Sequence, residues 1–219
     1  MTPTIRIGLL GTDPDVRLGR KLVLSSQPKF EVVFDSVGTP EDIEAISQSL
    51  IDVLVLDQRL SSDAGVTFYS SLRNLTGVKQ APPAILTASF AQPYLLLDAL
   101  QEGIFDVVSV EQGAAGLVAA VSRAYSRANV HSLSTVWELI CSQPSYRTVD
   151  FNFVRLVDEL PQGLASSLRK LKAVWQSSDS AKIEKFDLDS LKPLLARLPV
   201  LSSVELILAM NRSGLLDVE

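Results

Sequence analysis

Cysteine and histidine are almost missing from this chain of 219 residues, which has one of each, Cys141 and His131. A single cysteine cannot form a disulfide within the chain, and neither residue has the companions that a zinc site needs. His131 lies in a stretch with helical spacing, so we expect it at a surface or an interface rather than in catalysis or metal binding. We expect Cys141, beside Ile140 near a helix end, to be a small residue of the core.

Long apolar runs and an excess of basic charge are absent as well. The N-terminus MTPTIRIGLL has too short an apolar run for a signal peptide, and no stretch approaches the roughly 18 consecutive apolar residues of a membrane span. We therefore expect a cytoplasmic protein with no membrane partner. Residues 1–125 hold nine Lys and Arg against 14 Asp and Glu, and residues 126–219 hold 11 of each. Neither half is basic, and this charge balance disfavours nucleic acid as the partner.

Apolar residues make up 47% of the chain, and within residues 1–125 they gather into short runs separated by amphipathic segments. The runs span residues 5–10, 31–37, 52–57, 83–89 and 105–110. Each run is rich in Val, Ile or Leu, as expected of strands that are buried on both faces of a sheet. The clearest segments with helical spacing are residues 15–26, 40–49 and 93–102. Pro40 suits the first turn of such a helix.

Strands that alternate with helices in this way predict an α/β fold with a five-stranded, doubly wound parallel sheet. Right-handed crossovers place the carboxyl ends of all the strands on one edge of the sheet. Asp13, Asp57 and Thr87 all fall at such ends. We therefore expect these three side chains at the edge where open α/β sheets hold their sites.

Several motifs in this part of the chain occur in a characteristic order. LLGTDPDVR forms a first loop, VLVLDQRLSSDAGVTFYSSLR places Asp57 at a strand end with Gly65 eight residues later, AILTAS ends a strand near Thr87, and LQEGIFDVVSVEQ contains Gly103. In this order they resemble the receiver domain of two-component response regulators, over roughly residues 4–125. The resemblance implies a flavodoxin-like fold, with Asp57 as the phosphoacceptor and Thr87 as its partner hydroxyl.

Other positions depart from the receiver pattern. Receivers hold a divalent ion with two adjacent acids after the first strand, and the resemblance places Gly11 and Thr12 there, so that only Asp13 remains. The lysine that contacts the phosphoryl group corresponds to Val110, and the aromatic switch residue corresponds to Val107. Phosphoryl transfer onto a carboxylate needs positive charge around the phosphoryl group, normally from a divalent ion and a lysine. Because Mg²⁺ prefers carboxylate oxygens, we do not expect it to bind.

Two interpretations of Asp57 remain open at this stage. In one, Asp57 is phosphorylated weakly and shares an ion with Asp13. In the other, the domain is a pseudo-receiver and Asp57 is a polar strand end. A buried carboxylate without partners is costly, so in the second interpretation it is wetted or accepts a hydrogen bond, from Thr12 or Thr87. The loss of the ion-binding pair, the lysine and the aromatic favours the pseudo-receiver.

The receiver-like domain is expected to span residues 1–125, followed by a helical connector at 126–145. No Gly or Pro occurs between residues 117 and 143, and apolar residues recur there at three- and four-residue spacing. The last helix of the domain is therefore predicted to continue into the connector, where it offers a dimerisation surface. A break near residues 128–131 is the alternative.

Residues 146–219 are predicted to form a small, mainly α-helical domain for interaction or output, with four or five helices. Apolar stripes at helical spacing mark two of them, at 153–160 and 164–175. The segment QSSDSAKIEKFD, residues 176–187, is polar enough to be a surface loop or a hinge. We recognise in this part no helix-turn-helix motif and no glycine-rich signature of an enzymatic output domain.

The end of this domain has clearer helix signals. Ser202 and Glu205 form a capping-box pattern before an apolar run, and Gly214 suits the end of that helix. Trp137 and Trp175 lie on apolar stripes. Both are therefore expected in the core or in a dimer interface.

We interpret the chain as a signalling or scaffold protein that joins a degenerate receiver to a helical interaction domain. It is expected to act by protein–protein interaction, without phosphorylation of Asp57 and without a cofactor, on a protein partner or on a second copy of itself. No nucleophile–base pair or metal cluster can be assembled from the sequence, so an enzyme is not expected. The alternative is a transcriptional regulator that binds DNA through Arg169, Lys170 and Lys172.

Overall fold

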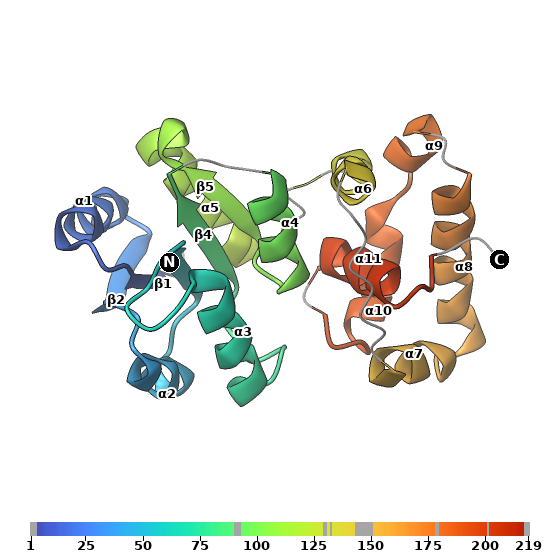
Figure 1. The fold of residues 1–219 in the computed structure, drawn as a ribbon, viewed down its shortest axis with the longest axis horizontal. Coiled ribbons are helices and arrows are strands. Elements are labelled where there is room, and N and C mark those ends of the chain that lie inside the picture. Colours follow the sequence, from blue (N-terminus) through green and yellow to red (C-terminus); the bar gives the residue numbers. More distant parts are fainter. Residues whose placement is uncertain are drawn as a thin grey trace. The chain divides into compact units, whose positions relative to one another are not determined.

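A computed structural model divides the chain into two compact units, Met1–Val130 and His131–Glu219. The residues described are 4–89, 93–128, 131, 133–142, 151–177, 180–200 and 202–216. The first unit is a parallel sheet with helices on both faces, and the described residues of the second form helices joined by short loops (Figure 1). Within these described ranges, no helix is long and apolar enough to cross a lipid bilayer.

The sheet of the first unit has five strands. They are β1 (Ile5–Leu10), β2 (Phe30–Ser36), β3 (Val53–Asp57), β4 (Ala84–Ala88) and β5 (Asp106–Ser109). Their order is β2-β1-β3-β4-β5, and all neighbouring strands are parallel. The apolar side chains of β1, β3 and β4 are buried, which explains why each strand is a continuous apolar run in the sequence. The predicted α/β class and the doubly wound parallel sheet are confirmed.

Helices cover both faces of this sheet. They are α1 (Pro14–Ser25), α2 (Pro40–Gln48), α3 (Gly65–Thr76), α4 (Pro93–Gln101) and α5 (Gly113–Ser126). Ile46 of α2, Phe68 of α3 and Leu95 of α4 belong to one apolar core with side chains of β3 and β4. On the opposite face, α1 lies beside α5. This double winding leaves the carboxyl ends of the strands open at one edge.

The start of α1 shows how the sequence shapes this edge. Asp13 is the N-cap of α1, where its Oδ1 atom accepts hydrogen bonds from the backbone N–H groups of Asp15 (2.9 Å) and Val16 (3.1 Å). Such caps satisfy donors that have no partner within the helix. The carboxylate of Asp13 therefore already has a structural role.

Arg6 of β1 and Asp52, just before β3, form a bidentate ion pair. Nε of Arg6 donates to Oδ2 of Asp52 at 3.0 Å, and Nη2 donates to Oδ1 at 2.9 Å. The side-chain hydrogen bond from Arg6 lowers the pKa of Asp52, although partial burial opposes this effect. A carboxylate with a lowered folded-state pKa stabilises the fold above its unfolded pKa, and this contribution is lost as the pH falls through the folded pKa.

We therefore expect acid to destabilise the wild type more than an Arg6→Met variant. Between about pH 5 and about pH 2, where Asp52 becomes protonated in both states, the wild type loses the contribution of the pair, whereas the variant lacks it throughout. Urea denaturation followed by circular dichroism at both pH values measures the two losses. Equal losses in the two proteins would show that the pair contributes nothing to acid sensitivity.

The second unit contains six α-helices and one 3-10 helix in its described residues. They are α6 (Leu133–Ser142), α7 (Phe151–Asp158), α8 (Gln162–Gln176), α9 (Ser180–Glu184), the 3-10 helix η2 (Leu188–Leu191), α10 (Lys192–Leu195) and α11 (Ser203–Arg212). Leu168, Leu171 and Trp175 form the buried stripe of α8. The predicted helical character and the core position of Trp175 are confirmed, whereas the side chain of Trp137 lies outside the described residues.

Both ends of α11 lie where the sequence predicts them. The Ser202 side chain accepts a hydrogen bond from the backbone N–H of Glu205 at 3.1 Å, as the capping-box pattern predicted. Gly214, shortly after the last turn, has φ 72°, a conformation that glycine adopts without steric cost. The predicted start and end of this helix are confirmed.

The long helix predicted to run through the connector at 126–145 is interrupted. α5 ends at Ser126, and the next residue, Arg127, has φ 51° in the left-handed region. The prediction of a continuous helix is therefore wrong, and the alternative, a break near residues 128–131, agrees with the separate helices α5 and α6. Residues 143–150, which include the end of the predicted connector, lie outside the described residues.

The polar segment at residues 176–187 was predicted as a loop, and this prediction is wrong for its middle part. Ser180–Glu184 form α9, and Ile183, the fourth residue of this helix, is fully buried. A helix of five residues is too short to show a helical stripe of apolar residues in the sequence. Tertiary packing around Ile183 holds this helix in place.

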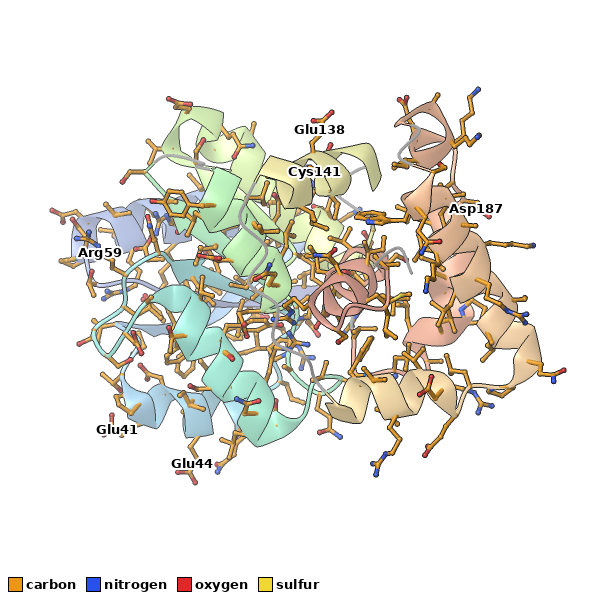
Figure 2. The ribbon with its side chains drawn as sticks, turned by 45° about the vertical axis from the view of Figure 1, so that its right-hand side comes forward. Glu41, Glu44, Arg59, Glu138, Cys141 and Asp187 are labelled. Carbon is orange, nitrogen blue, oxygen red and sulfur yellow. The ribbon has the colours of Figure 1, made fainter. Side chains whose placement is uncertain are left out.

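Cys141 is exposed on α6 and is not the core residue that the sequence predicted. The buried side of α6 carries Val136 and Leu139, whereas Cys141 and Glu138 are exposed on the helix, as Figure 2 shows. Partial burial nevertheless raises the pKa of the Cys141 thiol above its ordinary value. His131, between α5 and α6, is half-buried.

Candidate functional site

The parallel register of β3 and β4 brings Asp57 and Thr87 together. These two residues are partners across the two strands at the open edge of the sheet. The Thr87 hydroxyl lies 2.7 Å from Oδ1 of Asp57 and 3.0 Å from the carbonyl oxygen of Leu56, and Thr87 is buried. Of the two hydrogen-bond donors proposed from the sequence, Thr12 and Thr87, it is Thr87 that reaches the carboxylate.

Arg20 is the functional residue that the sequence reasoning missed. Its Nη1 atom donates to Oδ1 of Asp57 at 2.5 Å, and each of the two side chains is only 16% exposed. Arg20 lies four residues after Val16 on α1, so both residues face the same side of the helix. Arginine is seldom buried without a partner, and here the partner is Asp57. The sequence carries no signal that distinguishes Arg20 from the other basic residues of the first unit.

Gly11 lies directly against the carboxylate of Asp57. A Cβ atom at position 11 would lie 3.2 Å from Cγ of Asp57 and well inside van der Waals distance of its Oδ2. The space in which an acid at this position would begin is therefore filled by Asp57 itself. Thr12, the next residue, is exposed and lines the cleft beside Asp57.

Together these side chains form an open cleft of about 480 Å³, which we call the Asp57 cleft. Its walls include Thr12, Asp13, Arg20, Asp57, Thr87 and Val110. Arg59, from the loop after β3, also lines the cleft and is exposed; its side chain is labelled in Figure 2. Two carboxylates, Asp13 and Asp57, thus share the cleft with two guanidinium groups, and the local formal charge is balanced.

The carboxylate oxygens of the cleft do not fit the coordination of a divalent ion. Oδ1 of Asp57 accepts from Arg20 and Thr87, and Oδ1 of Asp13 caps α1. A hard cation needs several oxygen ligands, and a neighbouring guanidinium repels it. In the described part of the chain, no cluster of three or more His, Cys, Asp or Glu side chains could hold a metal.

The two remaining receiver positions carry apolar side chains. Val107 of β5 is buried in the core that α2, α3 and α4 share. Val110, at the start of the short 3-10 helix η1 (Val110–Gln112), is 69% exposed at the edge of the cleft. Where the resemblance would place the switch aromatic and the lysine, the cleft therefore has neither an aromatic ring nor a positive charge.

Solved structures resemble the first unit, whereas no protein-family model and no curated protein sequence matches the chain. The signal receiver domain of NarL from Mycobacterium tuberculosis has 22% identity and a TM-score of 0.51, covering 57% of this chain and 98% of its own. A LuxR-family response regulator from Aurantimonas sp. SI85-9A1 has 22% identity and a TM-score of 0.55, covering 64% and 97%. The response regulator domain of Thermotoga maritima CheB has 21% identity and a TM-score of 0.50, covering 56% and 97%. The receiver fold predicted for the first unit is confirmed.

Proposed function

We propose that the chain is a signalling protein of the response-regulator kind that acts through protein contacts and does not switch by phosphorylation of Asp57. In this proposal the first unit is a pseudo-receiver, an α/β scaffold that keeps the strand-end edge of a receiver without its chemistry. The helical second unit serves as an interaction domain. No catalytic activity, metal or cofactor is part of the proposal.

The contacts of the Asp57 carboxylate carry this proposal. Oδ1 accepts hydrogen bonds from Arg20 and Thr87, and Oδ2 lies on the side of Gly11, where a receiver would carry the first acid of its ion-binding pair. Attack on a phosphoryl group builds up charge that needs cations around it. Among the described residues, the cation in contact with Asp57 is Arg20, which stabilises the ground-state carboxylate through one of its N–H groups and so lowers the reactivity of that carboxylate.

Exposed apolar side chains on α1 support a protein partner. Leu18 and Leu22 lie one helical turn apart and are 55% and 64% exposed. Paired apolar side chains at a surface commonly mark sites of protein contact. A second copy of the chain is one such partner. The continuous helix over residues 117–140, from which the sequence predicted a dimer, is interrupted because α5 ends at Ser126.

Binding of DNA by the second unit receives less support. Arg169 and Lys170 are exposed on α8, as a phosphate-binding role requires. Acidic side chains are interspersed among the basic ones of this unit, and Lys192 is paired with Asp189 at 2.9 Å. A mixed surface of this kind favours a protein over a nucleic-acid backbone.

Incubation of the protein with Mg²⁺ and acetyl phosphate is expected to leave Asp57 unmodified. Intact-protein mass spectrometry measures the fraction that carries a phosphoryl group, and a receiver domain with a complete acidic pair and lysine, treated in parallel, serves as the positive control. We expect full modification of the control and none of this chain, because Arg20 and Thr87 hold the carboxylate and the cleft lacks the acidic pair and the lysine of a receiver.

Stoichiometric modification of the wild type that disappears in an Asp57→Asn variant would refute the pseudo-receiver proposal. Modification that persists in Asp57→Asn would report another side chain and would leave the prediction for Asp57 intact. The two outcomes are separated by the variant alone, since the reagent and the conditions stay the same.

A further inference from the structure

Helix α1 leaves an unusual amount of space beside the sheet. Leu24 is its only buried residue, and Val16, which faces the strand ends, is 42% exposed. A Cβ atom built on Gly19 would meet no other atom within 4 Å. By contrast, α3 has the same length and buries five residues. The side of α1 that faces α5 is therefore not filled by the protein itself.

This space forms a groove of about 320 Å³ between α1 and α5, which we call the α1–α5 groove. Val16, Gly19 and Val23 line it from α1, and Val110, Gly113 and Leu117 line it from the other side. The walls are apolar, and both glycines leave open space where a side chain would otherwise project. Water in such a groove has few hydrogen-bond partners, so an apolar ligand that displaced it would gain free energy.

The groove continues into the Asp57 cleft. Arg20 and Thr87 line both cavities, together with Val16, Ala88 and Val110. Arg20 uses Nη1 for its contact with Asp57, and a guanidinium has five N–H donors in all. A concave surface results that is apolar towards α5 and presents a positively charged donor at the point where it meets the cleft.

We propose that this groove binds a small molecule with an apolar body and one anionic or strongly accepting group directed at Arg20. Ligand sites in proteins are typically concavities of about 300–1,000 Å³, mostly apolar with a few polar groups that fix orientation. At about 320 Å³, and with Arg20 as the one charged side chain among the described residues of its lining, the α1–α5 groove has the size and the composition of such a site.

This inference goes beyond the proposed function, because it gives the pseudo-receiver a signal of its own. The ligand would lie at the carboxyl ends of β4 and β5, with its polar group beside the Arg20–Asp57 pair. It would thus occupy the edge at which a receiver is modified, without any covalent step. The site depends on the shape of the groove and on Arg20, and is independent of whether Asp57 can be phosphorylated.

Anilinonaphthalene sulfonate, which has an aromatic body and one anionic group, is a suitable probe, and its fluorescence rises in apolar sites. We expect saturable binding of one probe per chain of 219 residues. Gly19→Leu fills the groove and should raise the dissociation constant by about tenfold or more. Because Gly19 lies within a helix and its Cβ direction is open, leucine there should stabilise the fold, so the loss cannot be ascribed to unfolding.

Gly163→Leu is the matched control. Gly163 lies in α8 of the second unit, and a Cβ atom there also meets nothing within 4 Å. We expect this variant to bind the probe as the wild type does. Equal weakening by both substitutions, or no weakening by Gly19→Leu, would place the probe elsewhere and overturn the proposal.

The role of Arg20 is tested with a second probe, phenylnaphthylamine, which has the same rings without the sulfonate. The double variant Arg20→Met/Asp57→Asn removes both charges of the pair and keeps the local net charge unchanged. We expect it to weaken binding of the sulfonate about tenfold more than binding of the uncharged probe. If the binding of both probes is weakened to the same degree, Arg20 does not bind an anionic group and this part of the proposal is wrong.

Discussion

An Arg20→Met variant is expected to unfold with a free energy lower than that of the wild type by about 2–3 kcal/mol, because it leaves a mostly buried carboxylate without its cation. Asp57 would keep only the hydrogen bond from Thr87. Loss of one partner of a fully buried pair costs more, but each of these side chains retains 16% exposure, which permits some hydration. Hydrogen exchange of the β3 and β4 amides measures the change in the first unit alone.

The double variant Arg20→Met/Asp57→Asn separates the ion pair from the packing of the arginine stem. With the carboxylate replaced by a neutral amide, no charge is left without a partner, and we expect most of the lost stability to return. If the double variant is as unstable as Arg20→Met alone, the apolar part of the Arg20 side chain, rather than its charge, holds α1 against the strand ends.

The strands could be predicted within one or two residues because parallel strands under two layers of helices must be apolar throughout. β1 was predicted at residues 5–10 and is found there, and β3 was predicted at 52–57 and begins one residue later, at Val53. The proximity of Asp57 and Thr87 followed from the same argument, since neighbouring parallel strands end at one edge of the sheet. The backbone pattern alone determined these features.

Arg20 could not be placed in the same way, because its contact joins a helix to a strand 37 residues later. The sequence shows an acid without its usual cations, but it does not show which of nine basic residues in the first half compensates it. Only the packing of α1 decides that Arg17 pairs with Asp35 whereas Arg20 pairs with Asp57. Side-chain partners across elements depend on tertiary geometry, which local spacing does not encode.

The break after α5 was difficult to predict for a different reason. No Gly or Pro marks it, and Arg127 takes a left-handed conformation that is uncommon for a residue with a Cβ atom. The periodicity of apolar residues continues across the break into α6, so the sequence pattern predicts one continuous helix. The cost of the left-handed residue must be offset by packing, which the sequence does not display.

A Gly65→Ala variant is expected to lose about 4 kcal/mol or more of stability, because the new methyl group has no space. A Cβ atom at this position would overlap with the backbone carbonyl oxygen of Asp57, far inside van der Waals contact, and would lie 2.9 Å from Cδ1 of Leu86. Neither can move easily, since Asp57 ends a central strand and Leu86 is fully buried. The Gly65 N–H also donates to the carbonyl of Gln58 at 2.9 Å, which fixes the start of α3 from the other side.

Gly163→Ala, in the first turn of α8, provides the comparison, because its Cβ direction is open and alanine favours a helix by up to about 1 kcal/mol over glycine. We expect this variant to be as stable as the wild type or slightly more stable. Chemical denaturation of both variants gives the difference. A Gly65→Ala protein within about 1 kcal/mol of the wild type would mean that the loop between β3 and α3 can shift. In that case the backbone at Asp57 is not held rigidly, and fixed engagement of its carboxylate by Arg20 and Thr87 could not explain the low reactivity that we propose for it.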